Sequence, residues 1–508
     1  MLSVTIQRAR RLGLGLSLPV LDVRTLGSLL VYTIFAAFSL LQFTDPDFWW
    51  HLRTGQLIVD TGAIPKVDPF SFTAAGSHWV AHEWLSELLI YGVEKTVGYW
   101  GNVILFTALA LSALVVMHRL LLRMGVSPRV ALGLVVLGGT ISLPYWTVRP
   151  QVFSWLFMAI FLHTLYLRRI DPRTPLWHLP PLMLLWANLH LSYVFGLVLL
   201  GLWVAATAAE RVIWRQPHDL RVPALVFVAS LAATAVNPNG LALLTYPLTY
   251  LAPGNASQRF IGEWQSPDFH SPAHWPLAVG IVTLALVGLR GRGRNLFGPS
   301  LAIVFTLMAL MSARHQPLFA LVLMPVMGEV LREQWHWARQ EATSPPAPHG
   351  SLAINWSILA VAALVLALFV ARSPGLQLRG SPLTTGTFDY PVAGANFIRD
   401  NYPNARMFNT YHWGGYLINE LYPTQRVFID GRSDMYGDSL MEQYNRVAQL
   451  QPGWRDVLAQ YDIDLVIIEE DSPLAAALAE APDWRLAFSD PVEAVFVRSA
   501  DNASAKGP

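Results

Sequence analysis

The chain has 508 residues, of which 53% are hydrophobic and only 14% are charged, and its mean hydropathy is +0.39. Soluble domains carry about 25% charged residues, so this composition predicts a polytopic membrane protein. The net charge of +1 argues against a nucleic-acid partner, and the absence of cysteine excludes disulfides, thiolate zinc sites and cysteine nucleophiles.

Apolar runs recur that are long enough to cross a hydrocarbon core of about 30 Å, and they predict roughly eleven transmembrane helices. The fifth run is short and contains two prolines, which indicates a broken or re-entrant segment. The expected spans are residues 26–43, 101–122, 130–147, 152–167, 176–189, 193–209, 222–236, 275–289, 297–311, 317–331 and 352–370.

Basic loops alternate with acidic ones along the chain, beginning with the arginine-rich residues 7–13 before the first span. Arginine and lysine are retained on the cytoplasmic side, so we expect a cytoplasmic N-terminus and a C-terminus outside the cell inner (plasma) membrane. The first span has no small-residue cleavage site, which predicts an uncleaved anchor. Residues 341–351 are interpreted as a flexible cytoplasmic linker.

The composition changes near residue 372, which predicts two domains: a transmembrane domain, 1–371, with its first outer loop at 44–100, and a small extracytoplasmic α/β domain, 372–508. Alternating strand-like and helical patterns predict a partly parallel sheet in the second domain, and Ser472 is expected to cap a helix that Pro473 begins. The expected strands are 406–410, 426–430, 464–470, 484–490 and 494–498, and the expected helices are 393–401, 439–450, 453–461 and 472–481.

The first outer loop opens with two carboxylates, Asp45 and Asp47. A helix that begins near Pro46 would place Asp47, His51 and Thr54 on one stripe. Asp45 would lie at its N-terminus, where it is either a cap or a reactive carboxylate.

A second amphipathic helix, over about 82–97, is expected to lie along the membrane surface with Glu83 and Glu87 one turn apart. The alternative for Glu87 and Glu94 is a solvated acidic face.

Further polar residues fall at the outer ends of later spans. One interpretation is that outer loops are simply polar and that the tryptophans beside them form an interfacial belt. The other is that the span ends surround one cavity. The candidate binding residues are His51, Arg53, His82, Glu83, Arg149, Gln151, Asn188, His190, Glu263, Arg314 and His315.

These residue types suit group transfer from an anionic lipid. A carboxylate at a low-dielectric boundary can accept a proton from an acceptor group, or it can hold a divalent cation, with Mg or Mn as candidates. Arg149 and Arg314 are suited to bind a phosphate through charge-assisted bonds. No other cofactor is expected.

The acidic motif "DPDFWWHLRTGQLIVDTGAIPKVDPFSF", the surface helices, the many spans and the α/β tail together resemble the GT-C superfamily of integral-membrane glycosyltransferases. The layout is similar to the first loop of oligosaccharyltransferase catalytic subunits and of bacterial enzymes such as protein mannosyltransferases and aminoarabinose transferases. The resemblance implies that Asp45 or Asp47 is the catalytic acidic position. It also implies transfer of a sugar, with inversion, from a polyprenyl-phosphate donor to an extracytoplasmic glycan, lipid or protein.

The C-terminal domain has no motif like "WWDYG", so a peptide sequon is not the expected acceptor. The segment that contains His412, Trp413, Asp430, Arg432 and Asp434 can bind an acceptor glycan, or Asp430 and Arg432 can simply pair with each other.

Two other functions remain. A transporter or flippase for lipid-linked sugars would show charged residues at mid-depth and similarity between its halves. A non-catalytic assembly subunit for surface polysaccharide would not need the acids of the first loop.

Overall fold

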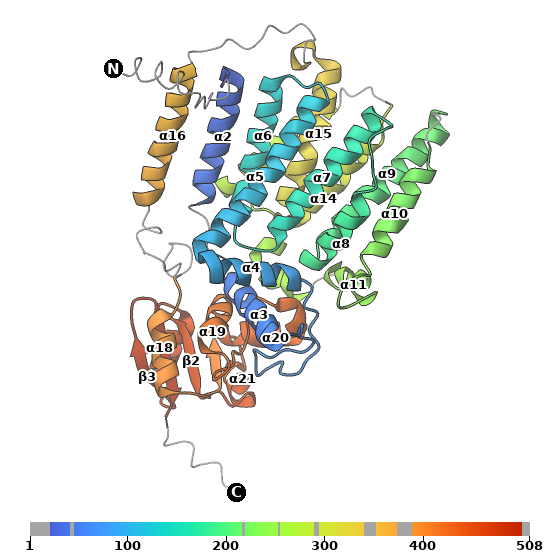
Figure 1. The fold of residues 1–508 in the computed structure, drawn as a ribbon. Coiled ribbons are helices and arrows are strands. Elements are labelled where there is room, and N and C mark those ends of the chain that lie inside the picture. Colours follow the sequence, from blue (N-terminus) through green and yellow to red (C-terminus); the bar gives the residue numbers. More distant parts are fainter. Residues whose placement is uncertain are drawn as a thin grey trace.

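The computed structural model describes residues 21–40, 45–215, 219–251, 255–288, 294–339, 352–372 and 389–499. The basic segment 7–13, the linker 341–351 and Thr44 lie outside these residues. Within them the chain forms a bundle of helices, with a small mixed α/β unit at one end of the bundle (Figure 1).

A helix is present at each of the eleven places where an apolar run predicts a span. The short fifth run is the 11-residue helix α8, as its length and prolines indicate. The eleven helices are α2 (Val23–Ser39), α5 (Tyr99–Arg123), α6 (Pro128–Ser142), α7 (Gln151–Ile170), α8 (Leu179–Leu189), α9 (Tyr193–Ile213), α10 (Arg221–Ala233), α13 (Trp275–Gly288), α14 (Phe297–Met311), α15 (Gln316–Gln334) and α16 (Leu352–Arg372).

Three stretches of the described chain are both long and apolar enough to cross a membrane by length and composition: Tyr99–Arg123, Pro128–Tyr145 and Tyr193–Ile213. Six further apolar helices are shorter, α2 and α8 among them. These helices support a multi-pass membrane protein, whereas a total of eleven spans stays a prediction.

Helices α3 (Phe48–Thr61) and α4 (Trp84–Val97) follow the first bundle helix and lie between the bundle and the α/β unit (Figure 1). Both occupy the places that the amphipathic patterns predict. They cross closely at Gly55, because a Cβ at that position would lie 2.7 Å from the backbone carbonyl carbon of Glu87. The contact fixes the middle of α3 against the first turn of α4.

Short helices and turns connect the bundle helices at the same end as α3 and α4. The "NPNG" segment is a turn, as expected, in which the Asn237 side chain accepts a hydrogen bond from the Asn239 N–H. The short elements are η1 (Leu143–Tyr145), α11 (Ala242–Thr245), η2 (Tyr246–Leu251), α12 (Ala256–Phe260), η3 (Gly262–Trp264), η4 (Pro272–His274) and η5 (Ala313–His315), with η6 (His336–Ala338) after α15.

The C-terminal unit is a four-stranded sheet in the order β1-β2-β4-β3, with one parallel pair and two antiparallel pairs. The partly parallel sheet is therefore confirmed, as is the Ser472 cap, whose side chain accepts from the Ala475 N–H. The strands are β1 (Met407–Asn409), β2 (Leu465–Glu469), β3 (Trp484–Ser489) and β4 (Glu493–Arg498). The helices are α18 (Val392–Asn401), η7 (Tyr411–Trp413), α19 (Gly414–Leu421), α20 (Ser433–Ala448), α21 (Trp454–Gln460) and α22 (Pro473–Ala479).

The strand predicted over residues 426–430 is wrong. Val427 forms only an isolated bridge, to Ser71 of the first outer loop. The Asn409 side chain hydrogen-bonds to the backbone of Phe428 and Ile429, in place of a ladder from strand β1. The apolar run is therefore buried as a connection between the first loop and the sheet.

Candidate active site

A polar cavity of about 550 Å³ lies where the bundle, helices α3 and α4 and the C-terminal unit meet. Eight of the thirteen candidate catalytic and binding residues of the transmembrane domain line it, from five separate segments of the chain. They are Asp45, Asp47, His51, His82, Glu83, Arg149, Glu263 and Arg314.

Arg149 joins the acidic residues of the cavity. Its guanidinium contacts Asp47, lies 3.6 Å from Asp45 Oδ1 and donates to both carboxylate oxygens of Glu263 at 3.1 Å. Burial raises the pKa of Asp45, and the charge of Arg149 opposes that rise. A guanidinium shared among three carboxylates holds them in fixed positions.

The two aspartates differ in how their carboxylates are occupied. Asp45 accepts from the Asp47 N–H at 3.0 Å and from the Thr147 hydroxyl at 2.8 Å, so both of its oxygens are hydrogen-bonded. Asp47 occupies the N-cap position of α3 but makes no capping bond. Arg149 contacts Asp47 Oδ2, so Oδ1 of Asp47 is the oxygen of the two aspartates for which the described residues give no hydrogen bond.

Arg314 has fewer carboxylate partners than Arg149. It donates to Glu263 Oε1 at 3.1 Å, and its guanidinium lies 5.0 Å from the centre of the Trp264 ring. The Tyr250 ring stacks on Trp264 at 5.2 Å. All these side chains line the cavity, so one wall offers a cation beside an aromatic surface.

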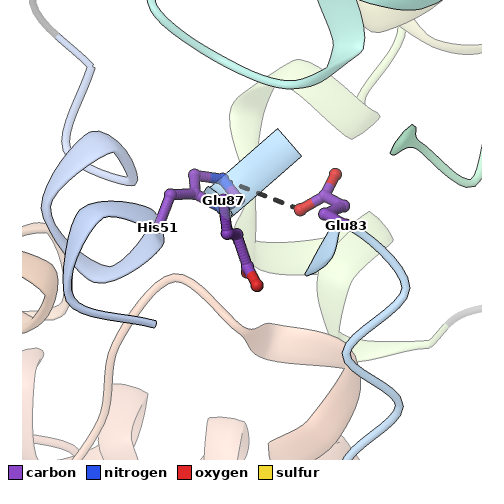
Figure 2. Close-up of side chains that lie close together, drawn as sticks. All are labelled: His51, Glu83 and Glu87. Carbon is purple, nitrogen blue, oxygen red and sulfur yellow. Dashed lines mark hydrogen bonds and ion pairs between the residues drawn. The ribbon is translucent and has the colours of Figure 1, made fainter. Parts of the chain in front are cut away.

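A second group of ionisable side chains lies one helical turn beyond Asp47. His51 Nε2 is 3.6 Å from Glu83 Oε2, and His51 Nδ1 is 3.5 Å from Glu87 Oε1 (Figure 2). Burial raises the pKa of Glu83 to about 8 and that of Glu87 well above its usual range, and it lowers the pKa of His51. The set of one imidazole and two carboxylates also fits a divalent metal ion.

The C-terminal unit closes the cavity opposite the bundle. Tyr411, His412, Gly431, Ser433 and Asp434 line the wall that it contributes. Tyr246 of the bundle donates its hydroxyl to Asp434, which joins the two parts of the chain across the opening.

Arg432 also lines this wall, although its side chain is almost completely buried. It donates to Asp430 through Nε at 2.8 Å and Nη2 at 2.6 Å. Its Nη1 lies 2.8 Å from Asp68 Oδ1, an ion pair without hydrogen-bond geometry. The pairing of Asp430 with Arg432 expected from the sequence is therefore present, and it extends to the first outer loop.

The other five candidate residues do not line the cavity. Arg53 donates to the Tyr422 carbonyl at 2.6 Å, Asn188 donates to Val236 O at 2.8 Å, and His315 Nδ1 lies 3.3 Å from Met308 O. Gln151 is buried at the start of α7. His190 lies just behind the wall, with Nε2 3.2 Å from Glu83 Oε1.

Sequence reasoning missed several lining residues. A solvated face is the alternative that the sequence leaves open for Glu87, but this residue is buried, with 1% of its surface exposed. Trp50, Trp79 and Tyr250 also line the cavity. The one sequence feature that indicates this role is their position beside clusters of polar residues. Of the lining residues that were missed, Thr147 was the easiest to predict, because it lies two residues before Arg149 in the same outer turn.

No protein-family model matches the chain, and no curated protein matches it. Solved structures of ArnT and of arabinofuranosyltransferase AftD align with most of the chain. ArnT from Cupriavidus metallidurans bound to undecaprenyl phosphate has a TM-score of 0.48 and 14% identity, over 96% of this chain and 98% of that chain. The apo state of ArnT has a TM-score of 0.49 and 15% identity, over 96% of this chain and 98% of that chain.

Arabinofuranosyltransferase AftD from Mycobacteria gives a TM-score of 0.48 and 13% identity over 94% of this chain. The present chain spans only 40% of the length of AftD. At these identities and TM-scores the alignments do not decide the activity, which has to be considered from the cavity itself.

Proposed function

We propose that the protein is a membrane glycosyltransferase that moves a sugar from a polyprenyl-phosphate donor to an extracytoplasmic acceptor. The cavity carries this proposal, because it places two aspartates and two arginines together at one end of an apolar helix bundle. We place the chain in the inner (plasma) membrane, with the cavity and the C-terminal domain (372–508) on the extracytoplasmic side of the transmembrane domain (1–371).

Asp47 is the proposed base. It would accept the proton of an acceptor hydroxyl while the acceptor oxygen bonds to the anomeric carbon of the donor sugar. The bond from that carbon to the phosphate oxygen breaks on the opposite face, so the configuration inverts and the electron pair leaves with the polyprenyl phosphate. Asp45, whose oxygens are already hydrogen-bonded, would position the Asp47 loop.

The leaving phosphate gains negative charge, and Arg314 is the proposed group that stabilises it. Among the described residues, Glu263 alone forms an ion pair with Arg314, so a phosphate oxygen can join or displace that carboxylate. Arg149 contacts Asp45, Asp47 and Glu263, and we assign it the role of holding the acids in place. The stacked Tyr250 and Trp264 rings offer a face for a sugar.

The test uses purified protein in lipid vesicles with a panel of radiolabelled undecaprenyl-phosphate sugars and membrane extract as the acceptor source. Undecaprenyl phosphate is chosen because ArnT was solved with it. We expect Asp47→Asn to lower transfer by about 10²–10⁴-fold while donor binding and protein level stay unchanged. The exposed Asp60, on the same helix, provides the matched Asp60→Asn control.

Full turnover by the Asp47→Asn variant would contradict the catalytic assignment. A non-catalytic assembly subunit predicts that result. A flippase predicts instead that wild-type vesicles move a labelled lipid-linked sugar across the bilayer without forming product.

A further inference from the structure

We propose that His51, Glu83 and Glu87 bind one divalent transition-metal ion, with Zn²⁺ preferred, in the wall of the cavity (Figure 2). This site is separate from Asp45 and Asp47, the residues to which the sequence assigned a metal as an alternative. Its binding can be measured without donor or acceptor, so it does not depend on the proposed transfer reaction.

The three side chains converge from two helices whose spacing is fixed. One ligand atom from each, an imidazole nitrogen and two carboxylate oxygens, can be chosen so that all lie within 4.8 Å of one another. All three residues are buried and line the cavity, which gives an ion a route of entry. The close crossing of α3 and α4 at Gly55 holds the histidine opposite the two glutamates.

Glu87 supplies an independent indication of a missing partner. Its Oε2 atom is buried and has no hydrogen-bond partner among the described residues. A buried carboxylate oxygen without a partner is costly, and a bound cation would remove that cost.

Neither Glu83 nor Glu87 forms an ion pair with a lysine or arginine of the described chain; their ion-pair partners are His51 and His190. The charged groups around them are already engaged: Arg314 with Glu263, and Arg432 with Asp68 and Asp430. Two neighbouring carboxyl groups that lack a lysine or arginine partner leave room for a divalent ion as their shared partner.

A chain of hydrogen bonds ends on His190, which lies beside Glu83. Trp186 Nε1 donates to Ser154 Oγ at 2.8 Å, which leaves the Ser154 hydroxyl hydrogen free to donate to His190 Nδ1 at 3.1 Å. The Ser192 N–H also donates to His190 Nδ1, so that nitrogen is an acceptor and Nε2 carries the hydrogen.

His190 Nε2 lies 3.2 Å from Glu83 Oε1, an ion-pair contact, and Glu83 Oε2 lies 3.6 Å from His51 Nε2. Metal-binding carboxylates are commonly held by such an outer partner, which fixes their orientation and raises affinity. His190, which does not reach the cavity, thereby acquires a role as a positioning residue.

The donor set selects the kind of ion. Mg²⁺ and Ca²⁺ prefer oxygen ligands, whereas an imidazole with two carboxylates suits Zn²⁺, with a fourth position open to water or substrate. Ligands around Zn²⁺ lie about 3–3.5 Å apart, so binding would draw the three side chains closer together by about 1 Å. Such a shift is within the reach of glutamate rotamers.

The experiment uses the full-length protein in detergent, stripped with EDTA and dialysed against Zn²⁺. We expect one Zn²⁺ per chain by elemental analysis, and a loss of at least about 10-fold in affinity by calorimetry for Glu83→Gln and Glu87→Gln. Co²⁺ in place of Zn²⁺ should give visible d–d absorption that Glu87→Gln removes. Glu94→Gln, on the same helix but bonded to Asn102, should bind as the wild type does.

His190→Gln should weaken Zn²⁺ binding by about 10–100-fold without abolishing it, as expected for an outer partner. Wild-type protein that binds no Zn²⁺ above the level of an EDTA-treated blank would overturn the proposal. So would a Glu87→Gln variant with wild-type affinity. Equal competition by Mg²⁺ would overturn the assignment of His51 as a ligand.

Discussion

Gly431 of the C-terminal unit lies directly against the carboxylate of Asp47, with no room between them for a side chain. A Cβ at residue 431 would overlap Asp47 Oδ1 and lie 2.8 Å from its Cγ. The wall of the cavity formed by the C-terminal unit is therefore in contact with the proposed catalytic carboxylate, through backbone rather than through a side chain.

We accordingly expect Gly431→Ala to displace Asp47 or the loop before α20. A displacement of about 1 Å in a catalytic group can cost about 10²-fold in rate, so transfer should fall by that order while the Tm changes by only a few degrees. The assay is the vesicle transfer reaction together with thermal unfolding in detergent.

Gly92→Ala is the matched control, because a Cβ at Gly92 in helix α4 meets no atom within 4 Å. It should leave transfer unchanged. Equal activity of the Gly431→Ala variant and the wild type would show that the C-terminal unit does not constrain Asp47.

Arg314 and Arg149 should behave differently when they are removed. Hydrogen bonds to charged groups contribute about 1.5–3 kcal/mol, so Arg314→Ala should weaken donor binding by about 10–100-fold. Arg149→Ala should instead lower turnover more than donor affinity, because it releases Asp45, Asp47 and Glu263 from a shared partner.

Binding of labelled undecaprenyl phosphate and the rate of transfer at saturating donor separate the two effects. Arg259→Ala is a control for loss of charge, since Arg259 forms an exposed ion pair with Glu442. Unchanged donor affinity in Arg314→Ala would remove the phosphate role from that residue.

Local patterns predict the elements of this site better than they predict its assembly. The stripe of Asp47, His51 and Thr54 and the spacing of Glu83 and Glu87 are local patterns, so both helices are found where they were expected. The sequence leaves a solvated face open as an alternative for Glu87, because the burial of Glu87 depends on a histidine 36 residues away and on the crossing with α3.

The closure of the cavity depends on contacts that are distant in sequence. Asp68 and Arg432 are 364 residues apart, and no periodicity links them. The run at 426–430 has strand-like residues, yet its neighbours are Ser71 and the Asn409 side chain rather than a ladder. Tertiary partners thus override β propensity there.

Arg432 should be the strongest single link between the first outer loop and the C-terminal unit. It is 2% exposed, pairs with Asp68 and Asp430, and lies 4.6 Å from the centre of the Trp79 ring. Arg432→Met leaves two buried carboxylates without their cation, which should cost about 3–5 kcal/mol.

Thermal unfolding of the purified variants measures this cost. Arg455→Met provides the comparison, because exposed Arg455 contacts only the Trp454 ring among the interactions described for it. Arg432→Lys should recover part of the loss, since it restores the charge but not the paired hydrogen bonds. A Tm of Arg432→Met equal to that of Arg455→Met would argue against the link.

Glu493 gives the C-terminal unit a stability that depends on pH. Its side chain is 1% exposed and accepts from the Gly394 N–H at 2.6 Å, and burial raises its pKa to about 7. Between the ordinary glutamate pKa and about 7, the unfolded chain has lost this proton while the folded chain keeps it. Stability should therefore fall as pH rises through that window and stay lower above it.

Glu493→Gln keeps an oxygen for the Gly394 N–H and carries no charge to bury. The variant should match the wild type near pH 5 and exceed it at pH 8, by on the order of 1–2 kcal/mol or a few degrees in Tm. Thermal unfolding of the full-length protein at several pH values measures the difference, and exposed Glu480→Gln should show none. A difference between Glu493→Gln and the wild type that is the same at pH 5 and pH 8 would mean that Glu493 does not carry the raised pKa in the folded chain.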